Sequence, residues 1–165
     1  MLLFAISAIA QSTCTRHVES AGRFSYCPPA GWAVKDSASG GPYKSFFTPD
    51  GAAVRANMNV KESATTLALN DFMASELMIL LADNETAGGD TRKIIGWTQF
   101  TTDSNIKGSR VVYETTYKGV LLRMVQYVLD FPGKKLVITG TALMSNKDTI
   151  AKVFDAVAKT VKLIP

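Results

Sequence analysis

Two cysteines, Cys14 and Cys27, carry the sulfur chemistry of this chain. Cys14 lies in a polar segment over 11–22, and Cys27 ends a short predicted strand over 24–27. An even number of cysteines behind an export-like start favours a disulfide, because export delivers a chain to an oxidising compartment. A Cys14–Cys27 bond would tie the polar segment to the sheet. The alternatives are two free thiols in a cytoplasmic protein, or a lipidated Cys14 with a buried Cys27.

The chain begins with ten uncharged, almost wholly apolar residues, MLLFAISAIA. Ala8 and Ala10 have the spacing that signal peptidase accepts, which predicts cleavage between Ala10 and Gln11. The stretch is too short to span a bilayer, which needs about 20 residues. It lacks the usual basic start, so a buried N-terminal strand or helix is the competing interpretation. We expect export to the periplasm or the exterior, and the absence of a lipobox before Cys14 makes a lipoprotein the less favoured form.

Groups able to do acid–base or nucleophilic chemistry are sparse. His17 is the one histidine, and a polar lead-in would not hold it firmly beside a nucleophile, as a catalytic triad requires. Ser104 and Lys107 match the pattern S-x-x-K, in which a lysine activates a serine, but they occur in a predicted turn. A surface turn is the favoured interpretation of that pair, and a hydrolase is kept as a minor alternative. We predict no catalytic residue.

Metal and nucleic-acid binding find little support in the composition. Asp83, Asn84, Glu85 and Asp90 could offer oxygen ligands to calcium, but their spacing is not that of an EF-hand, and a solvated loop is favoured. One histidine and two cysteines do not make a structural zinc site. The 18 basic and 14 acidic residues are scattered and give a net charge of +4, without a basic arm for nucleic acid. No phosphate-binding glycine motif occurs, so we predict no cofactor.

The elements that must position these residues can be predicted from hydrophobic periodicity. A chain of 165 residues with 47% hydrophobic and 19% charged residues is typical of one globular domain, here over 23–165. Short apolar alternations separated by turn residues predict strands. Helical spacing predicts one helix over 66–82 and another after 145. The later strands are predicted over 43–48, 52–60, 91–101, 108–118, 119–130 and 134–143, with antiparallel neighbours because their connections are short.

The strand over 119–130 is apolar on both faces, which requires a cover on each side of the sheet and so predicts three layers. The C-terminal helix, with a capping box expected at Ser145 and Asp148, presents one apolar stripe, and we expect Phe154 and Val157 to be buried under it. The mid-chain helix is apolar more widely. Its extra apolar residues are Met78, Ile79 and Leu81, and they predict a well buried helix.

Four residues near the start carry a family resemblance. Phe24 lies in a strand, and Pro29, Gly31 and Trp32 form a P-x-G-W pattern that resembles the start of PsbP-like proteins. That family includes an extrinsic subunit of photosystem II and secreted bacterial relatives of the DcrB type. The resemblance, which covers about 22–163, implies an α+β fold in which helices flank both faces of an antiparallel sheet of about 6–7 strands. Because Trp32 follows a Pro-Pro pair that ends the first strand and a glycine that permits a sharp turn, we expect it to be largely buried and to close the core edge, as part of a structural motif.

The resemblance further implies a binding or accessory role without enzyme activity. We therefore expect an exported, non-catalytic binding or assembly module of the bacterial envelope, with an envelope or secreted protein as its partner. The first alternative is a carrier of a hydrophobic small molecule, such as a lipid, between the C-terminal helix and the sheet. The second is the minor hydrolase already mentioned.

Overall fold

The computed structural model of the chain describes residues 14–19, 23–36, 44–47, 56–86 and 92–165. For 35–36, 44–47 and 81–86 it describes the backbone alone. The predicted signal peptide over 1–10 and its cleavage site lie outside the described residues. So do Asp90 and the residues between the strands predicted over 43–48 and 52–60.

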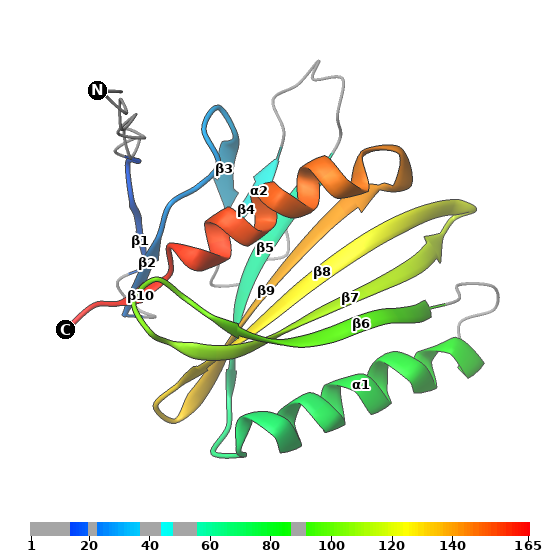
Figure 1. Cartoon of the computed structure of the whole chain (residues 1–165), viewed down its shortest axis with the longest axis horizontal. Coiled ribbons are helices and arrows are strands. Elements are labelled where there is room, and N and C mark those ends of the chain that lie inside the picture. Colours follow the sequence, from blue (N-terminus) through cyan, green and yellow to red (C-terminus); the bar gives the residue numbers. More distant parts are fainter. Residues whose placement is uncertain (1–13, 20–22, 37–43, 48–55, 87–91) are drawn as a thin grey trace, which may run out of the picture.

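A seven-stranded antiparallel sheet in the order β3-β4-β5-β9-β8-β7-β6 forms the centre of the molecule (Figure 1). Its strands lie close to the predicted ranges, and the antiparallel pairing is confirmed. The strand predicted over 52–60 extends to Ala64, and residues 52–55 lie outside the described residues. The strands are β3 (Ala33–Asp36), β4 (Lys44–Phe47), β5 (Ala56–Ala64), β6 (Arg92–Thr101), β7 (Lys107–Tyr117), β8 (Val120–Phe131) and β9 (Lys134–Leu143).

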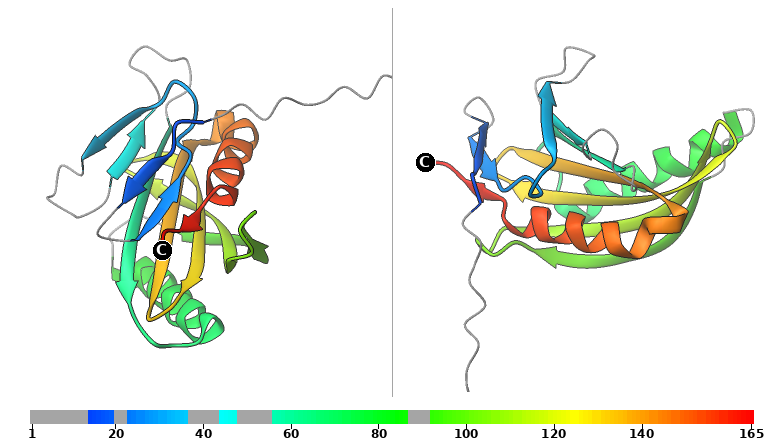
Figure 2. Two further views of the ribbon diagram at one scale, coloured as in Figure 1. Left: turned by 90° about the vertical axis from the view of Figure 1, so that its left-hand side faces the viewer. Right: turned by 90° about the horizontal axis from the view of Figure 1, so that it is seen from above.

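The two helices, α1 (Leu69–Thr86) and α2 (Lys147–Lys159), cover opposite faces of this sheet (Figure 2). Strand β8 supplies both cores: Val125 and Tyr127 belong to the cluster under α2, and Val128 belongs to the cluster under α1. The three-layer α+β architecture predicted from this doubly apolar strand is confirmed.

Helix α2 packs closely on β9. Ile150, Phe154 and Val157 are buried, as predicted. The ring of Phe154 lies so near Gly140 that a Cβ at position 140 would overlap it. The predicted capping box does not form, because a short 3-10 turn (Met144–Asn146) precedes the helix and Asn146 occupies the N-cap without a side-chain hydrogen bond.

Helix α1 is less buried than its composition suggested. Phe72 and Met73 are buried against the sheet, but Met78 is 68% and Ile79 57% exposed. The prediction that these two broaden the buried stripe is wrong, because a helix lying on a sheet presents one face to it and both residues fall outside that face. The side chain of Leu81 lies outside the described residues.

A second, three-stranded sheet joins the two ends of the chain. It has the order β1-β2-β10, with β1 (His17–Glu19), β2 (Phe24–Tyr26) and β10 (Lys162–Leu163). The segment predicted to be a polar, flexible lead-in therefore contains a strand, and no pattern in the sequence predicted β10. Strands of two or three residues are too short to show an alternating pattern.

Candidate functional site

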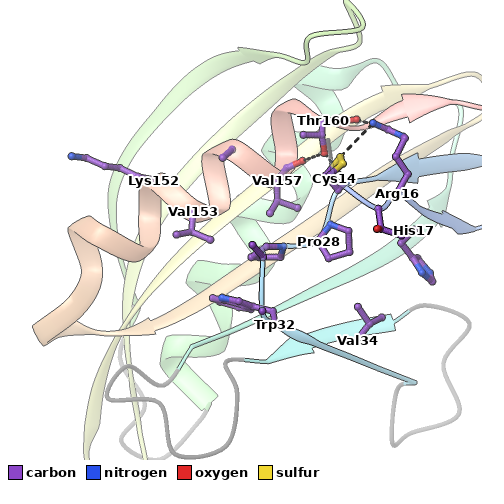
Figure 3. A pocket seen from close by; sticks show the side chains of 16 residues that line it. Cys14, Arg16, His17, Pro28, Trp32, Val34, Lys152, Val153, Val157 and Thr160 are labelled. Carbon is purple, nitrogen blue, oxygen red and sulfur yellow. Dashed lines mark hydrogen bonds between the residues drawn. A yellow bond between two sulfur atoms is a disulfide. The ribbon is translucent and has the colours of Figure 1, made fainter. Parts of the chain in front are cut away.

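The candidate site is a groove between α2 and the residues that surround the small sheet (Figure 3). It has a volume of about 1020 Å³ and opens to solvent. Most of its side chains are apolar, three are basic and none is acidic. It is lined by Cys14, Thr15, Arg16, His17, Cys27, Pro28, Pro29, Ala30, Gly31, Trp32, Val34, Lys152, Val153, Ala156, Val157 and Thr160.

A disulfide forms one end of the groove. Cys14 and Cys27 are bonded, with their Cα atoms 5.7 Å apart, as predicted from the sequence. The backbone N–H of Cys27 donates a hydrogen bond of 2.8 Å to the hydroxyl oxygen of Thr160, just beyond α2. The first described residue is thereby linked to the last turn of the C-terminal helix.

Arg16 holds the same three segments together. Its Nε donates to the hydroxyl of Ser25 at 3.1 Å, and its Nη2 donates to the carbonyl oxygens of Ser25 at 3.0 Å and Thr160 at 2.6 Å. Nη1 lies 3.6 Å from the sulfur of Cys27. Within the described part of the chain no carboxylate forms an ion pair with Arg16, so its charge is uncompensated there.

The P-x-G-W residues form the wall of the groove opposite α2. Gly31 has a φ of +76°, a conformation that favours glycine, and the N–H of Trp32 donates to the carbonyl of Pro29 at 3.1 Å. Trp32 meets Phe154 edge to face, with ring centroids 6.3 Å apart. Phe24 lies in β2, as predicted, and is fully buried in the core.

Trp32 has intermediate exposure, so most of its surface is buried, as predicted, and the remainder lines the groove. The indole packs on Phe154 in the core and also borders the groove, because the turn at Gly31 places Trp32 at the rim of the fold. Its position fits a contact residue as well as a packing residue.

His17 is fixed in β1, contrary to the prediction of a flexible segment. Its Nε2 lies 2.7 Å from a carboxylate oxygen of Glu19, and both side chains are largely buried. Its ring also packs on Tyr26, at a centroid distance of 5.2 Å. The strand that holds these contacts was missed, because its three residues are too few to show an alternating pattern.

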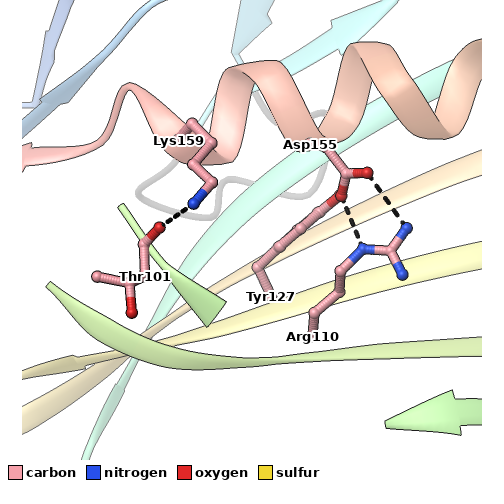
Figure 4. Close-up of polar contacts among 5 residues, drawn as sticks. All are labelled: Thr101, Arg110, Tyr127, Asp155 and Lys159. Atoms are coloured by element: carbon pink, nitrogen blue, oxygen red, sulfur yellow. Dashed lines mark hydrogen bonds and ion pairs between the residues drawn. The ribbon is translucent and has the colours of Figure 1, made fainter. Parts of the chain in front are cut away.

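A polar cluster anchors the opposite side of α2 to the sheet (Figure 4). Arg110 Nε donates to Asp155 at 2.7 Å, and the hydroxyl of Tyr127 donates to the same carboxylate. Lys159 donates to the carbonyl of Thr101. Burial, and secondarily the hydrogen bond to Asp155, raises the pKa of Tyr127 above its usual range, so the phenol remains a donor at neutral pH. These contacts hold the helix that forms one wall of the groove.

The other sequence candidates lie apart from the groove. Ser104, in the turn before β7, and Lys107, the first residue of β7, are exposed, as the surface interpretation predicted, and no hydrogen bond joins their side chains. Asp83, Asn84 and Glu85 belong to the last turn of α1 rather than to a loop. The described residues contain no cluster of three potential metal-binding side chains. In the same residues, no helix has the length and apolarity to cross a membrane.

Comparison with known proteins gives matches by structure. No family profile matches the chain, and no curated protein matches it in sequence. Cyanobacterial PsbP (CyanoP) from Synechocystis matches with a TM-score of 0.68 and 15% identity, over 98% of both chains. LpqN, involved in cell envelope biogenesis of Mycobacterium tuberculosis, matches with a TM-score of 0.60 and 12% identity, over 94% of this chain and 88% of LpqN.

The Ran-binding protein Mog1p of Saccharomyces cerevisiae matches with a TM-score of 0.62 and 8% identity, over 91% of this chain and 95% of Mog1p. At sequence identities of 8–15%, the structural similarity shows a shared fold and no more. The chain has a PsbP-like fold, as the resemblance of its first strand and P-x-G-W pattern implied.

Proposed function

We propose that this chain is an exported, non-catalytic binding or assembly module, and that its partner binds in the groove beside α2. The observation that carries this proposal is the groove itself, with its wide apolar lining and a volume of about 1020 Å³. Recognition sites are concave and mostly apolar, with a few polar groups that orient the bound molecule.

The anchoring of the groove supports a binding role. One wall is held by the disulfide and by Arg16, and the other wall, α2, is held to the sheet through Asp155 and Lys159. Walls that are fixed before binding lose less conformational entropy when a partner arrives. Two structural neighbours, a Ran-binding protein and a protein involved in cell envelope biogenesis, are in keeping with a binding or accessory role.

The disulfide supports the proposal of export, because disulfides persist mainly in oxidising compartments. Intact-mass analysis after alkylation without reductant tests this part. We expect no alkylated thiol in protein taken from its native compartment. Two alkylated thiols would contradict export to an oxidising compartment, and a diacylglycerol mass on Cys14 would indicate a lipoprotein.

Carriage of a hydrophobic small molecule is the second candidate, favoured by the same apolar lining. The groove rather than the helix–sheet interface would then hold the molecule. The space under α2 is filled by fully buried side chains such as Phe154, Tyr127 and Ile138. Native mass spectrometry of the purified chain would reveal a retained lipid as a discrete added mass.

Chemical crosslinking in the native cell tests the proposed function. We expect the full chain to give a discrete adduct that is lost in Val153→Asp, which places a charge in the groove, and retained in Val18→Asp, which changes an exposed residue outside it. Circular dichroism must show that both variants are folded. Absence of an adduct with the unmodified chain, or a hydrolytic activity that Ser104→Ala abolishes, would contradict the proposal.

A further inference from the structure

We infer that the tip of the β7–β8 hairpin, residues 117–121, inserts shallowly into a lipid surface that carries anionic headgroups. The tip lies at one end of the longest axis of the molecule, and the C-terminus lies at the other (Figure 1). None of its residues lines the groove beside α2, so the inference goes beyond the proposed function. It depends on the exposure of the apolar side chains of the tip, on their distribution over both faces of the hairpin and on its charge.

The apolar side chains of the tip are exposed although its backbone is regular. Tyr117 is 53%, Val120 47% and Leu121 46% exposed. Tyr117 and Val120 are paired in register, and the tight turn between them consists of Lys118 and Gly119, with φ values of +50° and +77°. Residues beside such a turn are ordinarily polar where the turn faces water, and exposed apolar patches mark sites of interaction with proteins or membranes.

These side chains occupy both faces of the hairpin. Strand β8 directs its odd-numbered side chains, such as Tyr127, towards α2 and its even-numbered ones, such as Val128, towards α1. Leu121 therefore lies on the α2 face, whereas Val120 and its cross-strand partner Tyr117 lie on the α1 face. A protein docked on one face would leave the other face in water. A lipid layer surrounds an inserted tip on both faces at once.

The size and the hydrogen bonding of the tip also favour lipid over protein. Three side chains at the end of a hairpin offer far less than the area of a stable protein interface, which is about 800 Å² on each partner. Backbone groups that enter lipid must be hydrogen-bonded within the protein, and the strand pairing extends to Tyr117 and Val120. A tyrosine ring, with its apolar body and its hydroxyl, suits the level of the headgroups.

The charge of the tip favours anionic headgroups. Lys118 is the one charged residue in 115–122, and its Nζ lies 5.4 Å from the centroid of the Tyr117 ring. The next charged side chains along the two strands, Glu114 and Arg123, form an ion pair with each other. The tip therefore has a net positive charge next to its apolar side chains. A lysine at such a place holds its ammonium among the headgroups while apolar neighbours enter the lipid.

Sedimentation of the full, oxidised chain with lipid vesicles tests the inference. One set of vesicles contains phosphatidylcholine alone, and the other contains phosphatidylcholine and phosphatidylglycerol in equal parts. We expect the anionic vesicles to bind the chain about fivefold or more tightly than the neutral ones. Brominated acyl chains should quench the tryptophan emission of Tyr117→Trp and leave that of the unmodified chain, whose Trp32 and Trp97 lie outside the tip, unchanged.

Variants on the two faces of the hairpin test insertion. Val120→Asp and Leu121→Asp should each weaken vesicle binding about tenfold or more, because a carboxylate would lose its hydration in the lipid. Val18→Asp is the matched control, since Val18 is an equally exposed strand valine, at 52%, and should change binding by less than about twofold. Lys118→Asn should weaken binding to the anionic vesicles about fivefold. Asparagine tolerates the positive φ of this position, and near-ultraviolet circular dichroism controls for the fold of every variant.

Absence of vesicle binding, equal binding to the two kinds of vesicle, or an equal loss in Val18→Asp would overturn the inference. Full binding by either Val120→Asp or Leu121→Asp would also overturn it, because both faces must enter the lipid. A dimer that Val120→Asp dissociates, without vesicle binding, would assign the tip to a second copy of the chain instead. The proposed function is tested separately, since a Val153-dependent adduct in the crosslinking experiment supports it whether or not vesicles bind.

Discussion

Helices α1 and α2 cover the same sheet from opposite sides, but they are attached to it differently. Helix α2 buries a continuous stripe, is bonded to β7 and β8 through Asp155, and has its end joined to the disulfide region through Thr160. Over its described side chains, 69–80, helix α1 is held mainly by apolar packing, with Phe72 and Met73 buried and residues such as Met78 exposed.

This difference shows which helix has a fixed position on the sheet. Apolar packing is not directional, whereas the hydrogen bonds of Asp155 and Arg16 fix the position and rotation of α2. The helix with the fixed position, α2, is the one that lines the groove. We therefore expect substitutions around α2 to affect stability and binding, and comparable substitutions around α1 to affect stability alone.

The largest expected effect comes from removing the central ring under each helix. Phe154→Ala should lower the free energy of unfolding by about 3–5 kcal/mol, because Phe154 is fully buried and its neighbours are fixed. Phe72→Ala should cost about 3 kcal/mol or less, since the helix above it can settle into the cavity. Urea titrations of both variants measure this difference, and a larger loss for Phe72→Ala would contradict the comparison.

The disulfide is expected to have the next largest effect. Replacing Cys14 and Cys27 with serine should cost up to about 3 kcal/mol, the value for a loop of this length, whose cysteines are 13 residues apart. The cost is reduced because the pairing of β1 with β2 and the bonds of Arg16 remain. Thermal unfolding of this double variant and of the reduced native chain should agree. An unchanged midpoint in both would show that the bond contributes nothing to stability.

The polar anchor of α2 should have a smaller effect. Asp155→Asn should cost about 1 kcal/mol, because the partly exposed carboxylate is screened by solvent although it serves both Arg110 and Tyr127. Asp148→Asn, an exposed change on the same helix, is the matched control and should cost less. If the two variants lowered the urea midpoint of unfolding by the same amount, the hydrogen bonds of Asp155 would not be what fixes α2.

The exposed side of α1 should have the smallest effect. Met78→Ser should change the free energy of unfolding by less than about 0.5 kcal/mol, because the side chain is 68% exposed. It should also leave the adduct of the native-cell crosslinking experiment unchanged. Loss of that adduct in the folded variant would extend the interaction surface to the α1 side.

Much of the fold was predictable because its long elements carry clear periodicity. The doubly apolar β8 predicted the three layers, and the stripe of α2 predicted the burial of Phe154. Met78 was wrongly predicted to be buried because the prediction used hydrophobicity alone. An apolar side chain on a surface helix need not face the sheet. Strands β1 and β10 were missed because two or three residues have no period to detect.

The site was less predictable than the fold. The disulfide followed from cysteine count and the export-like start, but the groove unites segments from 14–17, 27–34 and 152–160 that no local pattern connects. Arg16 was passed over as part of a polar lead-in. Its role depends on the carbonyl of Thr160, 144 residues away in sequence. Trp32 was interpreted as a packing residue because its sequence context does not show that part of the ring remains open.

Position-specific photocrosslinking tests the central claim, that partners bind in the groove beside α2, most directly. A photoreactive phenylalanine analogue is placed at Val153, which lines the groove, or at Met78, exposed on α1, in the full chain within its native cells. The account predicts a discrete protein adduct from position 153 and none from position 78. An adduct from position 78 with none from position 153 would contradict it.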